Sequence, residues 1–223
     1  MPSQQGSSPN GPRRTALAQD RSKQTRRRLV RAAVGLWTER GFDHGVEETT
    51  VEEIAKVAGV TKGTFYFHFA HKEDILLELG WGTAEALYEE AIRGAATRRS
   101  GLALLRQLLV SLARRVESVP RAAVERSVAG FYAGGAPRPV PGRRDLHHGL
   151  AVALDAARAQ NELPESTDTD ELARMMAALA MDAVLGWAQG DARRLRPLLQ
   201  SRADIIIDGA RSSSATPASG RSR

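Results

Sequence analysis

The sequence has no cysteine, few aromatic residues and no long apolar run. Without cysteine it can form no disulfide framework, thiolate zinc site, iron–sulfur cluster or cysteine nucleophile. Only 5% of its residues are aromatic, whereas alanine and leucine abound and β-branched runs are scarce, so we expect an all-α fold. No stretch approaches the roughly 18 uninterrupted apolar residues of a membrane span. We therefore expect a soluble, cytoplasmic chain with no membrane association, and its 223 residues suggest one or two domains.

The net charge of +6 is spread unevenly along the chain. Residues 13–31 carry eight basic side chains and one acidic side chain, and residues 211–223 carry three further arginines. The body of the chain, 32–210, is therefore mildly acidic. A basic arm on an acidic body suits a polyanionic partner such as nucleic acid, although a merely solubilising terminus has the same composition.

The two ends of the sequence have too few apolar residues to offset the entropy lost on ordering. We expect a disordered basic arm over 1–21 and a disordered tail over 211–223. Helical periodicity between them predicts helices at about 22–40, 51–58, 62–69, 72–94, 101–117, 119–133, 143–160, 168–189 and 195–210. We expect loops over 42–49 and, because of its proline and glycine, over 134–142.

The most informative segment is Thr50–Phe69, which predicts two short helices joined at Ala58–Thr61. A tight glycine-containing turn between short helices is typical of a helix-turn-helix motif. We expect Phe65 and Phe69 to face the core, while the start of the second helix reaches base edges in the DNA major groove. A helical hairpin inside an ordinary bundle is the alternative. The segment's polar tips, on Lys62, Tyr66, His68 and Lys72, favour DNA contact.

Residues 54–69, read as Ile-Ala-Lys-Val-Ala-Gly-Val-Thr-Lys-Gly-Thr-Phe-Tyr-Phe-His-Phe, together with Arg27–Phe42 and Lys72–Leu76, resemble the TetR family of transcriptional regulators. The resemblance implies an N-terminal three-helix DNA-binding domain over 22–80 and a C-terminal helical ligand-binding and dimerisation domain over 81–210. It also implies a homodimer, a near-palindromic double-stranded operator, a small-molecule effector and no cofactor. The residues expected to contact DNA are Arg26, Arg27, Arg28, Thr50, Thr61, Lys62, Gly63, Thr64, Tyr66, His68 and Lys72.

Two stripes of the predicted last helices are candidates for the dimer interface. They consist of Leu172, Met176, Leu179, Ala183 and Gly186, and of Leu195, Leu199, Ile206 and Ala210. Periodicity alone favours packing inside one subunit, whereas the resemblance implies a four-helix interface between two. The bulky residues that we expect to line a ligand cavity are Trp81, Tyr88, Phe131, Tyr132, Met175, Met181 and Trp187, although each of these types is more often core.

The sequence gives no sign of a metal site or of an active site. His147 and His148 are adjacent, so on a helix they point about 100° apart and chelate one metal poorly. No Gly-x-Ser-x-Gly elbow, phosphate-binding glycine loop or His-Glu-x-x-His motif is present. We therefore expect no metal and no catalysis.

Taken together, these patterns predict a ligand-responsive transcriptional regulator that acts as a repressor. The effector would favour a spacing of the two recognition helices that misfits the operator. The alternative is a helical scaffold or binding protein that contacts nucleic acid without reading its sequence, through the basic arm. An enzyme is the least favoured of these three classes of protein.

Overall fold

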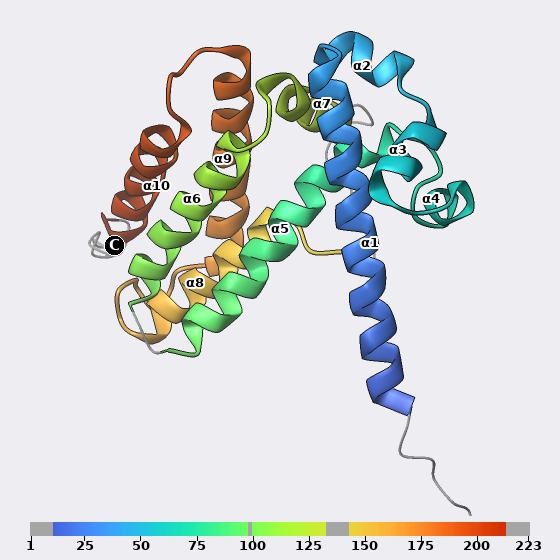
Figure 1. The fold of residues 1–223 in the computed structure, drawn as a ribbon. Coiled ribbons are helices and arrows are strands. Elements are labelled where there is room, and N and C mark those ends of the chain that lie inside the picture. The colour runs from blue at the N-terminus through green and yellow to red at the C-terminus, as the bar shows by residue number, and fades with distance from the viewer. Residues whose placement is uncertain (1–10, 98–99, 133–142, 213–223) are drawn as a thin grey trace, which may run out of the picture. The chain divides into compact units, whose positions relative to one another are not determined.

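The computed structural model describes residues 11–97, 100–132 and 143–212, and within these ranges the chain forms ten α-helices and no strand (Figure 1). The helices are α1 (Gly11–Glu39), α2 (Phe42–Glu48), α3 (Val51–Ala58), α4 (Lys62–His68), α5 (Asp74–Ala95), α6 (Gly101–Glu117), α7 (Arg121–Tyr132), α8 (Leu146–Ala159), α9 (Thr169–Gln189) and α10 (Leu195–Ser212). The all-helical prediction is confirmed. In the described ranges, none of these helices is long and apolar enough to cross a membrane.

The chain divides into two compact units between Ile75 and Leu76, inside α5. This division falls five residues before the boundary expected at 80. The reason is that a single continuous helix leads from one unit into the other, so no linker composition marks the change in the sequence.

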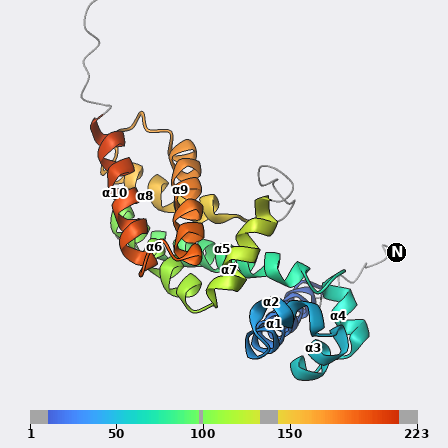
Figure 2. The ribbon, with the colours of Figure 1, turned by 90° about the horizontal axis from the view of Figure 1, so that it is seen from above.

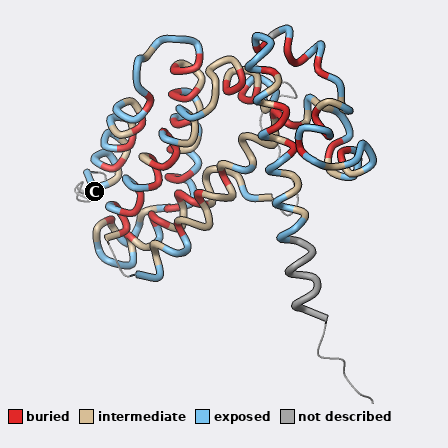
Figure 3. Tube along the Cα trace, in the orientation of Figure 1, coloured by how far each residue is buried: buried red, intermediate tan, exposed pale blue. Residues whose placement is uncertain are grey.

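The first unit packs α1 against α2 and α3, and α3 against α4 (Figure 1). Its core contains the apolar face of α1, including Leu29 and Trp37, together with Ile54 of α3 and Phe65 of α4. Burial alternates along these helices as expected of amphipathic segments (Figure 3). The inward position predicted for Phe65 and Phe69 is confirmed, because both side chains are buried.

The loop predicted over 42–49 is wrong, because this segment contains the helix α2. Phe42 and Val46, four residues apart, are both buried, and the Phe42 ring packs edge-to-face on Trp37 at 5.8 Å between centroids. A Cβ on Gly45 would lie 2.5 Å from the Trp37 carbonyl oxygen, so glycine is required where α2 crosses α1. The tertiary contact with α1, rather than local propensity, makes this segment helical.

The disordered arm predicted over 1–21 is corrected in its second half, because α1 begins at Gly11 and not at Ser22. Pro12 is tolerated in a first helical turn, and the following Ala-Leu-Ala-Gln are good helix formers. At the other end, α10 includes Arg211 and Ser212 of the predicted tail. Residues 1–10 and 213–223, and the loop predicted over 134–142, lie outside the described residues.

In the second unit α6, α8, α9 and α10 form a four-helix bundle, in which each helix contacts two of the others, and α7 packs on α9 (Figure 2). Large side chains of α6 and α8, such as Leu105, Leu108 and Leu154, are fully buried between the helices. Five residues predicted for the dimer interface lie in this core, namely Leu172, Met176, Ala183, Leu195 and Leu199. They pack within one subunit, as periodicity alone indicated, and are not available to a second chain.

Candidate nucleic-acid interface and effector cavity

The turn between α3 and α4 is built on a glycine in the left-handed conformation. Gly59 has φ 65° and ψ 41°, and the backbone N–H of Val60 donates to the Ala55 carbonyl at 2.9 Å. Arg28 of α1 donates through Nη2 to the carbonyl oxygens of Ala58 and of Gly59, the latter at 3.1 Å. Arg28, which we predicted to contact DNA, therefore holds the turn of the motif in place.

The helix α4 presents a polar and aromatic face to solvent. Thr61 caps the helix by accepting from the backbone N–H of Thr64 at 3.1 Å. Lys62, Gly63 and Tyr66 are exposed, and Thr64 is half-buried. These residues lie on one continuous surface of α4, as expected for the second helix of a helix-turn-helix motif.

Thr50 opens α3 with a reciprocal capping box. Its hydroxyl oxygen accepts from the backbone N–H of Glu53 at 3.2 Å, and the Glu53 carboxylate accepts from the backbone N–H of Thr50 at 2.8 Å. The Thr-x-x-Glu spacing of Thr50 and Glu53 is typical of such a box. Thr50 is exposed beside the start of α3.

Three further basic residues predicted to contact DNA differ in their surroundings. The Arg26 guanidinium lies 4.8 Å from the centroid of the Phe69 ring, and Lys72 Nζ donates to the carbonyl oxygens of Glu47 and Thr49 at 2.8 and 3.0 Å. Arg27 is exposed. Arg26 and Lys72 thus contact groups of the same unit and stabilise it. Arg27 is open to solvent.

The sequence analysis missed Phe67, whose side chain is 79% exposed on α4 between Tyr66 and His68. The half-buried His68 has its ring 5.1 Å from that of Phe67, centroid to centroid. An exposed phenylalanine next to polar residues marks a contact surface rather than a core. The available signal was its position: four-residue spacing places Phe65 and Phe69 inside, so Phe67 must point away.

An ion pair joins the two helices of the motif. Lys62 Nζ donates to the Glu52 carboxylate, which lowers the pKa of Glu52 and raises that of Lys62. Both side chains are more than half exposed, so water and salt screen the pair strongly. Any other anion that approaches the Lys62 ammonium must therefore compete with Glu52.

We expect Glu52→Gln to tighten binding to duplex DNA about two- to fivefold, because the substitution frees Lys62 and removes a negative charge that repels phosphate. Fluorescence anisotropy with a labelled duplex measures this effect. Glu48→Gln, which removes an exposed charge that is not paired with Lys62, is the matched control. Equal gains for the two variants would show that the pair does not restrain Lys62.

A second ion pair connects α1 to α3. Arg40 donates to the Glu53 carboxylate, with Nη2 2.6 Å from Oε1, and also to the Thr49 hydroxyl at 3.2 Å. Hydrogen bonding from Arg40, then from the Thr50 backbone, lowers the pKa of Glu53 from 4.5 to about 2. The ionised form is thus the one that the folded state favours.

Because the pKa of Glu53 is lower in the folded state, its contribution to stability is present above about pH 4.5 and is lost as the pH falls toward 2. We expect Glu53→Gln to lower the melting temperature at pH 7 and to differ less from the wild type at pH 3, where part of the contribution has been lost. Glutamine can still close the capping box, so the variant isolates the ion pair with Arg40. Circular dichroism melts at both pH values measure this difference, and a constant gap would contradict it.

The second unit contains a cavity of about 510 Å³ bordered by α5, α6, α7, α8 and α9. Four of the bulky residues predicted to line a ligand site do so: Trp81, Phe131, Tyr132 and Met181. The other three are elsewhere: Arg144 covers the Tyr88 ring, Met175 is exposed, and Trp187 is buried beneath Arg121. The lining of the cavity is mostly apolar, and the volume of the cavity is in the range of small-molecule sites.

A few polar groups on the cavity wall determine which polar groups a ligand could carry. The buried Nε–H of Arg115 has no hydrogen-bond partner among the described residues, although its guanidinium lies 3.9 Å from Glu90. The Ser127 hydroxyl, in contrast, is already bound to the Leu76 carbonyl oxygen at 2.6 Å. Arg115 and Arg174 both line the cavity, so positive charge borders the space in which a ligand would bind.

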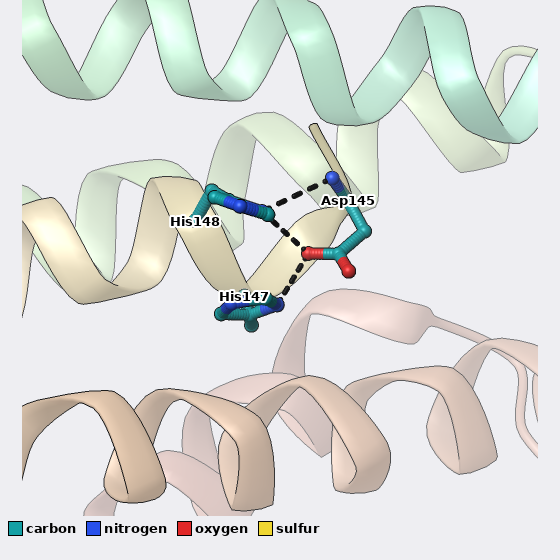
Figure 4. Close-up of side chains that lie close together, drawn as sticks. All are labelled: Asp145, His147 and His148. Atoms are coloured by element: carbon teal, nitrogen blue, oxygen red, sulfur yellow. Dashed lines mark hydrogen bonds and ion pairs between the residues drawn. The ribbon is translucent and has the colours of Figure 1, made fainter. Parts of the chain in front are cut away.

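The expected divergence of His147 and His148 is wrong. Their ring centroids are 4.1 Å apart, and both Nδ1 atoms lie close to one oxygen of Asp145 (Figure 4). Helical spacing alone does not include Asp145, the residue before α8, whose carboxylate contacts both rings and draws them together. The prediction that no metal site exists loses this support.

Two short helices joined by a left-handed glycine, with an exposed face on the second, define a helix-turn-helix protein. Residues 29–79 match the model of the family "Bacterial regulatory proteins, tetR family". Over 71 residues the chain is 42% identical to the HTH-type transcriptional regulator TcmR of Streptomyces glaucescens, covering 32% of this chain and 28% of that protein. It is 27% identical over 197 residues to the HTH-type transcriptional repressor BepR of Brucella suis, covering 84% and 88% of the two chains.

The fold is also similar to the crystal structure of Thermus thermophilus FadR, a TetR-family transcriptional repressor in complex with lauroyl-CoA. The TM-score is 0.60 at 29% identity, over 82% of this chain and 94% of that one. The chain spans less than half the length of some curated relatives that it matches, including TcmR. Residues 29–79 therefore match the DNA-binding part of the TetR family, and most of the chain is similar in fold to a TetR-family transcriptional repressor.

Proposed function

We propose that this protein is a transcriptional repressor that reads a near-palindromic operator with α4 and releases it when a small molecule binds in the second unit. The observation that carries the proposal is the exposed face of α4 around Gly63. A Cβ there would meet nothing closer than the Thr61 hydroxyl at 3.8 Å, so the fold does not require glycine at this position. Glycine is also a poorer helix former than alanine, by up to about 1 kcal/mol in a helix interior and by less in a first turn, where Gly63 lies. A backbone that must approach DNA closely accounts for that cost.

Selection of bound duplexes from a randomised pool at about 150 mM salt tests the proposal, because the sequence-independent term is weakened there. We expect enrichment of a near-palindrome whose half-sites are about 34–36 Å apart, one turn of DNA. Absence of any enriched sequence would leave only charge-driven binding through the basic residues of α1, which is the scaffold alternative.

We propose a mainly apolar effector that carries one hydrogen-bond acceptor or anionic group. The apolar lining of the cavity favours such a body, and the arginines on its wall, Arg115 and Arg174, favour an acceptor or anionic group at one end. The Thermus thermophilus relative binds lauroyl-CoA, of which only the acyl chain is apolar, because the coenzyme A part carries several phosphates. Laurate, an apolar chain with one carboxylate, matches the proposed class and is therefore a suitable first probe for release of the operator.

We also propose a homodimer formed through the outer faces of α9 and α10. Large apolar side chains are exposed there: Met175 by 50%, Leu179 by 40% and Ile205 by 70%. Arg202 of α10 donates to the Leu179 carbonyl at 2.7 Å and pairs with Asp182 at 2.5 Å, which holds the two helices in one surface. Of the residues predicted for this interface, Leu179 is exposed and Gly186, Ile206 and Ala210 are half-buried. Sedimentation velocity measures the mass of the assembly.

Release of DNA then follows from a shift in population between two dimer geometries. The effector must bind the geometry that misfits the operator better than the one that fits, because equal affinity shifts nothing. A preference of a few kcal/mol is sufficient for regulation.

A further inference from the structure

Three metal-ligating side chains of the second unit converge on one point at the start of α8 (Figure 4). Nδ1 of His147 lies 2.5 Å from Oδ1 of Asp145, and Nδ1 of His148 lies 2.8 Å from the same oxygen. One ligand atom from each residue lies within 4.8 Å of the other two. All three side chains are partly buried, with the His147 side chain 17% exposed.

The local backbone explains why the three groups meet. Asp145 is the extended residue that precedes α8, with φ −94° and ψ −176°, and the side chain of such a residue lies over the first turn of its helix. His147 and His148 occupy that turn. The backbone N–H of Asp145 lies 3.3 Å from Nδ1 of His148 and holds this ring beside the carboxylate. Because Nδ1 has one lone pair, a metal ion bound there would replace this contact.

We propose that Asp145, His147 and His148 together bind one divalent transition-metal ion of the zinc class. Two imidazole nitrogens and one carboxylate oxygen form a borderline ligand set that suits such ions, whereas calcium and magnesium prefer oxygen ligands alone. Zinc–ligand bonds of about 2.0–2.1 Å place the ligand atoms of a tetrahedral site about 3.3 Å apart. The two nitrogen–oxygen distances here, 2.5 and 2.8 Å, are shorter than that spacing, so each nitrogen must move away from the Asp145 oxygen by several tenths of an ångström.

The surroundings of His147 support binding through Nδ1. Its other nitrogen, Nε2, lies 3.8 Å from Oδ1 of Asp170, and Asp170 is itself paired with Arg174. A histidine that binds a metal through one nitrogen commonly donates the N–H of the other to a carboxylate, which fixes the ring. At 3.8 Å this pair is longer than a hydrogen bond, so Nε2 must move toward Asp170 by about 0.6 Å or more before the carboxylate can orient His147.

The cations nearest in the sequence are directed to other partners. Arg143 donates to the Glu78 carboxylate at 2.8 Å, and the Arg144 guanidinium lies 3.8 Å from the centroid of the Tyr88 ring. Neither contact involves the Asp145 carboxylate. Asp145 and His147 also border the cavity, so an ion held here would have coordination positions left for water on that side.

The test uses the full chain after treatment with a chelator and desalting, titrated with zinc sulfate in a calorimeter in the absence of DNA. We expect one zinc ion per chain, and at least about tenfold weaker binding for His147→Gln and for Asp145→Asn. Asparagine at position 145 still favours the start of a helix, so circular dichroism should show that this variant remains folded. Cobalt absorption spectra provide a second readout, because a protein-bound tetrahedral ion has a distinctive visible band.

The matched control is His71→Gln, an exposed histidine of the first unit, which should bind zinc as the wild type does. Equal zinc affinity for His147→Gln and the wild type would overturn the proposal, and so would the absence of binding by the wild type. The titration contains no DNA, so its outcome tests the metal site independently of the proposed function.

Discussion

Alanine at Lys62, Thr64 and Tyr66 together should lower affinity for the selected operator at least about 100-fold. Each side chain lies on the face of α4 that we assign to DNA, and loss of a base or phosphate contact at each position multiplies the effect. Lys62 and Tyr66 are exposed and Thr64 is half-buried, so little core packing is removed. Anisotropy titrations at a fixed salt concentration measure the change, with circular dichroism to verify the fold.

The matched control for this variant is a change in the basic part of α1. Alanine at the exposed residues Arg21, Lys23 and Arg27 removes three positive charges without touching α4. We expect this variant to bind every duplex more weakly and to show a shallower salt dependence. If the α1 variant lost sequence preference and the α4 variant kept it, the recognition surface would have to be reassigned.

Filling the cavity of the second unit should abolish effector binding and leave DNA binding unchanged. Ala177 lines the cavity on α9, so Ala177→Phe places a bulky ring in space that a ligand would occupy. Anilinonaphthalene sulfonate is a suitable probe because it combines an apolar body with one anionic group. We expect its binding to weaken at least about tenfold, as steric exclusion from a pocket requires.

Ala103→Phe is the matched control for the cavity, since residue 103 is exposed on α6 and does not border it. This variant should bind the dye as the wild type does. Operator affinity should be unchanged in both variants, so the filled protein would remain on DNA when an effector is added. Equal dye binding by Ala177→Phe and the wild type would place the ligand site elsewhere.

The parts of the structure that follow local rules could be predicted from the sequence. The capping box at Thr50, the left-handed turn at Gly59 and the inward pair Phe65 and Phe69 each depend on residues a few positions apart. These features were sufficient to place the helix-turn-helix motif. Their information is local, which is why it can be read without a structure.

The features that could not be predicted depend on contacts between distant segments. The helix α2 forms because Gly45 allows close approach to Trp37, and Arg28 reaches the carbonyl oxygens of Ala58 and Gly59 thirty residues later. Arginine at position 28 was therefore assigned to DNA, although its guanidinium stabilises the turn. Periodicity likewise could not tell the core stripe of α9 from its exposed face, because both have helical spacing.

The most direct test of the central claim is the ratio of two dissociation constants, for the selected operator and for a scrambled duplex of equal length, both at about 150 mM salt. Specific DNA-binding proteins bind their sites about 10³-fold or more tightly than other DNA. We predict a ratio of that size for this protein. A ratio near one, with both constants rising together as salt is added, would contradict the claim that α4 reads sequence.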